Sequence, residues 1–290
     1  MSDQTIFITG GSGFIGSVVI EYAIADGYTV TALSRTEESD TKLKSLGATP
    51  IRGDLKSLVI LERETAKADV VINIADFLVD GKMTMEERFS INNAAVAALA
   101  AGLKGSGKLL ILTGGSLYVK AHPEEKETDE SSPGWDKDHP FRWIVLNKDK
   151  NLAHAKDGIR VSYCRLAPFV YGRGGSGVKL FMDIWAQAGA GVHINDGKAR
   201  ITTIHVEDTA RLYLRIKEGL GKSTTPRPRR MLRTKMGDFF ATFLASENRV
   251  SNRKAREELG WEIKAENGII EEIEMGSYME VAEKSRKGAA

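Results

Sequence analysis

Three glycines near the start of the chain limit its fold more than any other feature of the sequence. They are Gly10, Gly13 and Gly16. The segment just before them, Thr5–Thr9, has the apolar pattern of a short strand, and a helical pattern begins at Ile15, just before the last of them. A strand that turns through glycines into a helix presents free N–H groups and the positive end of a helix dipole to a phosphate. We therefore expect a dinucleotide-binding loop made of Gly10, Ser12, Gly13, Phe14, Ile15 and Gly16.

Short apolar runs alternate with helical patterns throughout the first 170 residues. Such alternation is typical of a parallel sheet with helices on both faces. The sequence therefore predicts an α/β protein with a doubly wound parallel sheet, the Rossmann architecture, connected by right-handed crossovers. The expected strands are Ile6–Thr9, Tyr28–Leu33, Thr49–Arg52, Val70–Ile74, Lys108–Thr113 and Val161–Leu166.

The pattern changes after Gly172. We interpret residues 1–171 as the dinucleotide-binding domain, to which 201–218 return as a strand and a helix. Residues 172–200 and 219–290 are expected to form a small C-terminal substrate-binding lobe. Within that lobe the pattern predicts a helix from about Ile269 to Lys287.

Composition excludes several classes of protein. Lys and Arg number 41 against 39 Asp and Glu, and a balance this even lacks the basic footprint of a nucleic-acid binder. A single cysteine, Cys164, cannot form an internal disulfide and fits a reducing compartment. No apolar run approaches the ~18–20 residues of a membrane span. We expect a cytoplasmic protein with a small-molecule substrate and neither a nucleic-acid nor a membrane partner.

The residues after the second strand bear on the choice of cofactor. An NAD-selective site usually places an acidic residue here to bind the ribose hydroxyls. This chain has Ser34 and Arg35 instead, a hydroxyl and a guanidinium that suit a 2′-phosphate. We therefore expect NADP(H) as the preferred cofactor, with NAD(H) as the alternative. Asp54 and Leu55, after the third strand, are expected beside the adenine.

Eight ordered segments together resemble the extended short-chain dehydrogenase/reductase superfamily, in its NAD-dependent epimerase/dehydratase group. They are TGGSGFIG at Thr9–Gly16, GDL at Gly53–Leu55, VINIAD within Val70–Asp76, LILTGGSLYV at Leu110–Val119, ETDESSP at Glu127–Pro133, RLAPFVYG at Arg165–Gly172, HVEDTARLYL at His205–Leu214 and SNRKAREELGW at Ser251–Trp261. The resemblance implies cofactor contacts from Ala75, Thr113, Lys148 and Pro168. It also implies helices that pair in a homodimer, which the sequence leaves open.

The resemblance further implies a catalytic Ser or Thr after the fifth strand and a Tyr-x-x-x-Lys motif on the next helix. Here the serine position holds Gly114, and the residue four before Lys148 is Ile144. We take Lys148, Ser116 and Tyr118 as the candidate catalytic residues. No His or Cys cluster has the spacing of metal ligands, so we expect no metal.

Ile144 and Gly114 leave the proton donor for carbonyl reduction open. Hydride transfer to an iminium carbon or an activated alkene makes a smaller demand on such a donor. The favoured interpretation is an NADPH-dependent oxidoreductase that reduces a small, apolar metabolite, either an imine or iminium, or an activated C=C bond. The alternatives are a nucleotide-sugar epimerase or dehydratase, in which the basic loop Arg227–Lys235 contacts phosphate, and a dinucleotide-responsive binding protein without activity.

Overall fold

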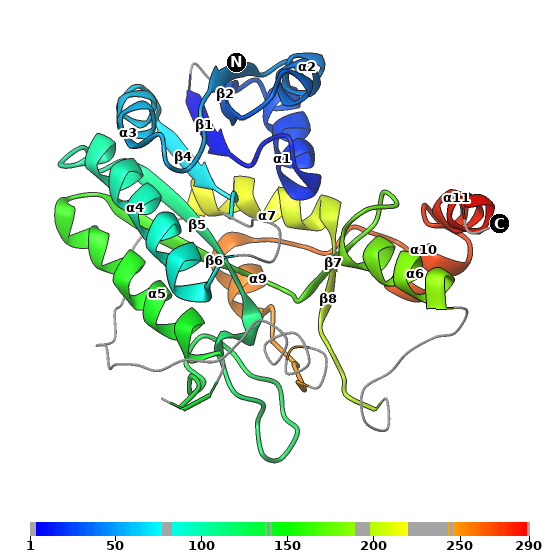
Figure 1. The fold of residues 1–290 in the computed structure, drawn as a ribbon. Coiled ribbons are helices and arrows are strands. Elements are labelled where there is room, and N and C mark those ends of the chain that lie inside the picture. The colour runs from blue at the N-terminus through cyan, green and yellow to red at the C-terminus, as the bar shows by residue number, and fades with distance from the viewer. Residues whose placement is uncertain are drawn as a thin grey trace.

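A six-stranded parallel sheet forms the centre of the molecule (Figure 1). The structure is a computed structural model that describes residues 4–76, 83–136, 138–139, 141–188, 198–219, 243 and 246–288. The strands follow the order β3-β2-β1-β4-β5-β6, so the predicted doubly wound sheet is confirmed. Their bounds are β1 Thr5–Thr9, β2 Thr29–Ser34, β3 Thr49–Arg52, β4 Val70–Asn73, β5 Leu109–Gly115 and β6 Arg160–Leu166.

Helices cover both faces of this sheet, because alternate strand residues are apolar on each side. One face packs against α1 (Phe14–Ala25), α2 (Glu37–Ser45) and α7 (Val206–Gly219). The other packs against α3 (Leu58–Lys67) and α4 (Met85–Leu103), and α5 (Arg142–Leu152) lies against α4. The returning helix α7 lies against α1 in the fold, although about 180 residues separate the two in the sequence.

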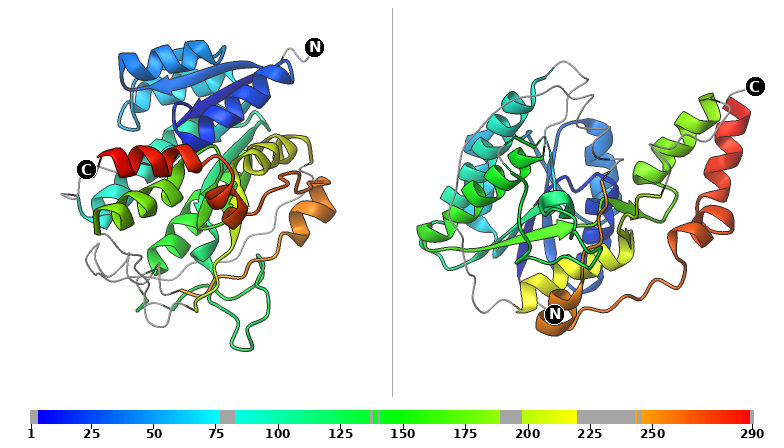
Figure 2. Two further views of the ribbon diagram at one scale, coloured as in Figure 1. Left: turned by 90° about the vertical axis from the view of Figure 1, so that its right-hand side faces the viewer. Right: turned by 90° about the horizontal axis from the view of Figure 1, so that it is seen from below.

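A smaller group of elements stands beside the sheet (Figure 2). Strands β7 (Phe169–Tyr171) and β8 (Thr203–His205) pair in parallel, and α6 (Ser176–Ala188) packs on β7 and on α11 (Met279–Gly288). Its small core contains the buried side chains of Tyr171, Val178 and Tyr278. Helices α6 and α11 come from the residues that we interpret as a substrate lobe, whereas β7 and β8 come from the segments that we assign to the dinucleotide-binding domain. The division into these two units stays a prediction.

The prediction of a single helix from about Ile269 to Lys287 is wrong in the middle of that range. The structure has two helices, α10 (Ile269–Glu274) and α11, with a turn between them. The carboxylate of Glu272 accepts hydrogen bonds from the N–H and the hydroxyl of Ser277, which fixes this turn. Side-chain contacts of this kind compete with the helical pattern that periodicity alone predicts.

The remaining short elements connect these parts. The 3-10 turns η1 (Ser116–Tyr118) and η2 (Ala153–Asp157) follow β5 and α5, and α9 (Arg253–Leu259) packs on α7. Arg173 joins two helices, because its guanidinium bonds Glu21 on α1 and Glu207 on α7. Among the described residues, no helix is both long and apolar enough to cross a bilayer.

Candidate active site

The glycine loop between β1 and α1 has no room for side chains. Gly10 has φ +77°, and a Cβ there would lie 2.8 Å from the backbone nitrogen of Ala75. A Cβ on Gly16 would lie 2.2 Å from the carbonyl oxygen of Gly10. The loop is therefore a bare backbone turn packed against the end of β4, as a backbone that must approach a pyrophosphate requires.

The first turn of α1 is open to an anion. Gly13 precedes the helix without a side-chain cap, and the first turn contains no acidic residue. The N–H groups of such a turn need an acceptor from outside the helix. Lys42 on α2 adds a positive charge, because its Nζ donates to the carbonyl oxygen of Ser12 at 2.8 Å. The ring of Phe14 lies against Gly175 of the smaller group of elements, where a Cβ would be 2.5 Å from it.

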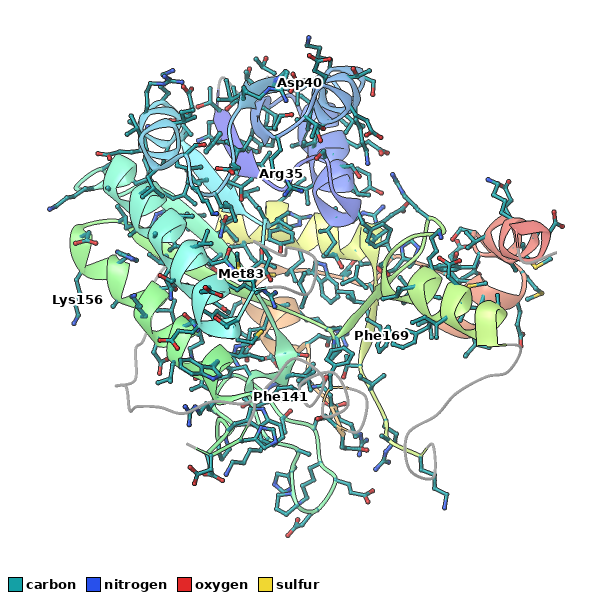
Figure 3. The ribbon with its side chains drawn as sticks, viewed as in Figure 1. Arg35, Asp40, Met83, Phe141, Lys156 and Phe169 are labelled. Atoms are coloured by element: carbon teal, nitrogen blue, oxygen red, sulfur yellow. The ribbon has the colours of Figure 1, made fainter. Side chains whose placement is uncertain are left out.

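The two residues expected to select the cofactor, at the end of β2, differ in exposure. Ser34 is buried, and its hydroxyl donates to the carbonyl oxygen of Thr36. Arg35, labelled in Figure 3, is exposed, and its guanidinium has no hydrogen bond or ion pair with the described residues. Of the two, Arg35 is therefore the one free to bind a phosphate.

Asp54 and Leu55 follow β3 in a local turn. The carboxylate of Asp54 accepts hydrogen bonds from the N–H of Lys56 and the hydroxyl of Ser57. Leu55 is buried in the core. Asp54 thus shapes this turn by local bonds, and adenine contact by either residue remains a prediction.

Tyr118 and Lys148 meet at the end of β5. The Nζ of Lys148 donates to the phenol oxygen of Tyr118 at 2.5 Å, and both side chains are buried. The guanidinium of Arg165 lies 4.6 Å from the centre of the Tyr118 ring, and Lys148 Nζ lies 3.4 Å from Oδ1 of Asp149. The structure thus joins a phenol to an ammonium although Ile144 replaces the tyrosine of the helical motif.

Two other predicted hydroxyls are engaged elsewhere. Thr113 Oγ1 donates to the carbonyl oxygen of Asn73 and bonds the phenol of Tyr213, on the sheet face that α7 covers. Ser116 is buried, and its hydroxyl donates to Oδ1 of Asn248. Neither hydroxyl is brought to the Tyr118–Lys148 pair by a hydrogen bond.

A second phenol occupies the space that a side chain at Gly114 would need. A Cβ built on Gly114 would lie 2.3 Å from Cε1 and 2.5 Å from the hydroxyl oxygen of Tyr163. Tyr163 is half-buried on β6, and its hydroxyl has no hydrogen-bond partner among the described residues. Burial raises the pKa of Tyr163 to about 12, Arg165 lowers it, and Tyr118 and Asp149 raise it further. The phenol therefore keeps its proton at neutral pH.

Aromatic side chains around the strand ends fall into separate groups. Trp135 stacks on His139 with ring centres 3.7 Å apart and meets Phe141 edge-on. Phe169 instead contacts Phe181 and Phe243. Figure 3 shows Arg35 above the centre of the view and Phe141 below it. Pro168 is half-buried just before Phe169, and the basic loop Arg227–Lys235 lies outside the described residues.

Comparison of the whole sequence with known families agrees with this geometry. The sequence model described as the NAD dependent epimerase/dehydratase family matches residues 6–226. The chain belongs to this family. It is accordingly an enzyme of the short-chain dehydrogenase/reductase type that uses a nicotinamide dinucleotide.

The chain is also similar to two relatives and to one solved structure. Uncharacterized protein YLL056C of Saccharomyces cerevisiae is 29% identical over 300 residues, covering 92% of this chain and 97% of the relative. The sterol-4-alpha-carboxylate 3-dehydrogenase, decarboxylating, of Dictyostelium discoideum is 38% identical over 96 residues, covering 33% and 29%. The fold is similar to that of UDP-glucose 4-epimerase of Thermotoga maritima, solved with UDP-glucose, with a TM-score of 0.68, 20% identity, and 99% and 100% coverage.

The sequence did not single out Lys42 or Tyr163. Tyr163 is on a strand expected from its apolar pattern, and only the pairing of β5 with β6 brings it over Gly114. The signal was the glycine itself, since a missing side chain next to a strand leaves volume that a large neighbour fills. The described part of the chain contains no group of three or more side chains that could hold a metal ion.

Proposed function

We propose that the enzyme is an NADPH-dependent reductase of a small, apolar metabolite. The observation that carries this proposal is the buried hydrogen bond between Lys148 Nζ and the phenol of Tyr118. It supplies a proton donor next to a cation, at the same sheet edge as the dinucleotide loop. The bound dinucleotide supplies the hydride.

The preference for NADP(H) rests on Arg35. Its exposed guanidinium has no partner within the described residues, at the strand end where an NAD-selective site carries an acid. A 2′-phosphate would give it a charge-assisted hydrogen bond. The glycine loop and the uncapped first turn of α1 fit the pyrophosphate that NAD(H) and NADP(H) share.

Tyr118 and Lys148 meet the demand for a proton. When a carbonyl carbon accepts hydride, the electron pair of the C=O π bond moves to oxygen, and that oxygen takes the Tyr118 proton. The ammonium of Lys148, 2.5 Å from the phenol oxygen, stabilises the phenolate left behind until solvent returns a proton. An iminium acceptor, which the sequence suggested, makes less use of this pair.

The nucleotide-sugar epimerase remains the second candidate. The family includes such enzymes by its description, and the Thermotoga maritima structure contains UDP-glucose. An epimerase needs no net consumption of reduced cofactor, whereas the proposed reductase oxidises one NADPH for each substrate reduced. The two functions therefore differ in a measurable quantity.

The test is NADPH oxidation by the full chain with a panel of acceptors. The panel contains cyclohexanone and acetophenone as ketones, 2-cyclohexen-1-one as an enone, and 3,4-dihydroisoquinoline as a cyclic imine, with UDP-glucose assayed separately for epimerisation. Oxidation of NADPH with an apolar acceptor supports the reductase. Epimerisation of UDP-glucose without net NADPH oxidation contradicts it, and so does the absence of dinucleotide binding by calorimetry.

A further inference from the structure

We propose that Tyr163 is a second catalytic phenol, which donates a hydrogen bond to the carbonyl oxygen of the substrate in place of the serine that Gly114 replaces. The inference rests on the proposed reductase function and names its substrate class. The acceptor is a compound with a carbonyl oxygen, a ketone or an enone, and not an iminium ion.

The register of the sheet places Tyr163 next to Gly114. Gly114 on β5 pairs with Arg165 on β6, so Tyr163, two residues earlier on β6, is on the same face as Gly114. The phenol oxygen lies 2.5 Å from the point where a Gly114 Cβ would be. A serine at position 114 would place its hydroxyl one bond beyond that Cβ, so the phenol brings its oxygen to the region where the serine oxygen would lie.

The hydroxyl of Tyr163 is available to a ligand. Its hydroxyl has no hydrogen-bond partner among the described residues, and the side chain is half-buried. Thr113, Ser116 and Tyr213, by contrast, each have a hydroxyl that is already bonded within the protein. Because its pKa is raised to about 12, Tyr163 remains a hydrogen-bond donor throughout the neutral range.

The charges at this site decide the substrate class. Lys148 donates to the neighbouring Tyr118, and Arg165 lies 4.6 Å from the same ring. The carboxylate of Asp149 lies 3.4 Å from Lys148 Nζ, so these three groups together carry one net positive charge. That charge favours an oxygen that becomes negative as hydride arrives and disfavours an iminium ion. A carbonyl oxygen has two lone pairs for two phenol donors, whereas an iminium nitrogen has none. This assignment narrows the alternatives that the sequence alone left open.

The role of each group follows. The carbonyl carbon accepts the hydride from the reduced nicotinamide dinucleotide, and the π electron pair moves to oxygen. Tyr163 donates a hydrogen bond to that oxygen and keeps its proton, while Tyr118 transfers its own proton to the oxygen and forms an alcohol. For an enone the β-carbon accepts the hydride, the same two donors stabilise the enolate oxygen, and a proton from solvent at the α-carbon then gives the saturated ketone. One NADPH is oxidised for each carbonyl compound reduced.

The variant Tyr163→Phe tests the inference, because it keeps the ring over Gly114 and removes only the hydroxyl. We expect kcat for the ketones and the enone to fall about 10²–10³-fold, as when one oxyanion donor is removed. The dissociation constant of NADPH and the melting temperature should remain those of the wild type. The control is Tyr28→Phe, which makes the same change immediately before the amino end of β2 and should leave kcat unchanged.

A second measurement does not depend on turnover. Protein labelled with ¹³C at tyrosine Cζ gives seven resonances, one for each tyrosine, and Tyr163→Phe identifies the one from Tyr163. Cyclohexanone added to the complex with NADP⁺, which cannot transfer hydride, should shift this resonance and leave that of the fully buried Tyr213 in place.

The outcomes separate the two proposals. If the wild type reduces ketones and Tyr163→Phe retains kcat within threefold, or the Tyr163 resonance does not shift, the assignment of Tyr163 is overturned while the reductase stands. Reduction of 3,4-dihydroisoquinoline alone also overturns it. If the wild type binds no dinucleotide or oxidises NADPH with none of the acceptors, both proposals fail.

Discussion

Tyr163 fills the volume that a side chain at Gly114 would need, with Cε1 only 2.3 Å from the point where a Cβ would lie. The two residues are on adjacent strands, β6 and β5, and are offset by two positions in the register. With Tyr163 in this position, a side chain at 114 would force the phenol ring to move. Glycine at 114 therefore leaves the space that the phenol occupies.

This relationship predicts strong coupling between the two positions. Gly114→Ala should lower the free energy of unfolding by about 1–3 kcal/mol, because the new methyl group overpacks the Tyr163 ring. In a Tyr163→Leu background the same substitution should cost less, with a coupling energy of roughly 0.5–3 kcal/mol. Gly115→Ala is the matched control, since a Cβ there meets nothing within 4 Å. Urea unfolding measures the four proteins of this cycle and the control, and equal costs of Gly114→Ala in both backgrounds would contradict the packing.

Arg35 should discriminate between the two dinucleotides. A hydrogen bond to a charged group contributes about 1.5–3 kcal/mol, and each 1.4 kcal/mol is about tenfold in affinity. Arg35→Ala should therefore raise the dissociation constant of NADP⁺ about 10–100-fold and leave that of NAD⁺ nearly unchanged. Titration calorimetry of both cofactors measures this, with the exposed Arg256→Ala as control. Equal losses for both cofactors would show that Arg35 does not contact a 2′-phosphate.

The sheet could be predicted from the sequence because its signals are local. Each strand is a short apolar run between turn residues, and the glycine loop identifies the first strand and helix. Thr49–Arg52 has the bounds that the pattern predicts. The break at Ser277 was missed because it depends on one side-chain contact from Glu272 rather than on periodicity.

The contacts of Tyr118 with Lys148 and of Tyr163 with Gly114 join residues far apart in the sequence, so no local sequence pattern predicts them. Tyr118 and Lys148 are 30 residues apart, and the segment between them is irregular over most of its length. Their contact follows from the positions of η1 and α5 around the end of β5. In the same way, Tyr163 reaches Gly114 only through the pairing of β5 with β6. Motif matching looks for a tyrosine four residues before Lys148 and finds Ile144. Tyr118 was a candidate because it follows the fifth strand, and Tyr163 was missed.

Lys148 should be required for turnover and dispensable for folding. Lys148 is 4% exposed and lies 3.4 Å from the carboxylate of Asp149, so removing the lysine alone would leave a buried charge uncompensated. The test is therefore the double variant Lys148→Met/Asp149→Leu, because replacing both partners of a buried ion pair by apolar side chains is often neutral for stability. We expect kcat to fall at least about 10²-fold, the lower range for positioned acid–base groups, with the melting temperature maintained. Lys150→Met, an exposed position on the same helix, is the control. A kcat within threefold of the wild type would remove Lys148 from the mechanism.

We expect the buried thiol of Cys164 to make the protein less stable as pH rises above neutrality. Burial raises the pKa of Cys164 to about 12, whereas a thiol in an unfolded chain titrates near about 8.5. Above that pH the unfolded chain releases a proton that the folded protein retains. The free energy of unfolding should therefore decrease as pH rises, by up to about 1.4 kcal/mol per pH unit from this group.

Cys164→Ala isolates this contribution. Urea unfolding at intervals between pH 8 and 10 should give a steeper decrease for the wild type than for the variant, because every other titrating group is common to both. The thiol, which is 4% exposed, should also resist iodoacetamide at pH 9 in the folded protein and react at once in 8 M urea. Parallel decreases in the two proteins, or rapid alkylation of the folded wild type, would show that Cys164 is ionised and accessible at the sheet face covered by α7.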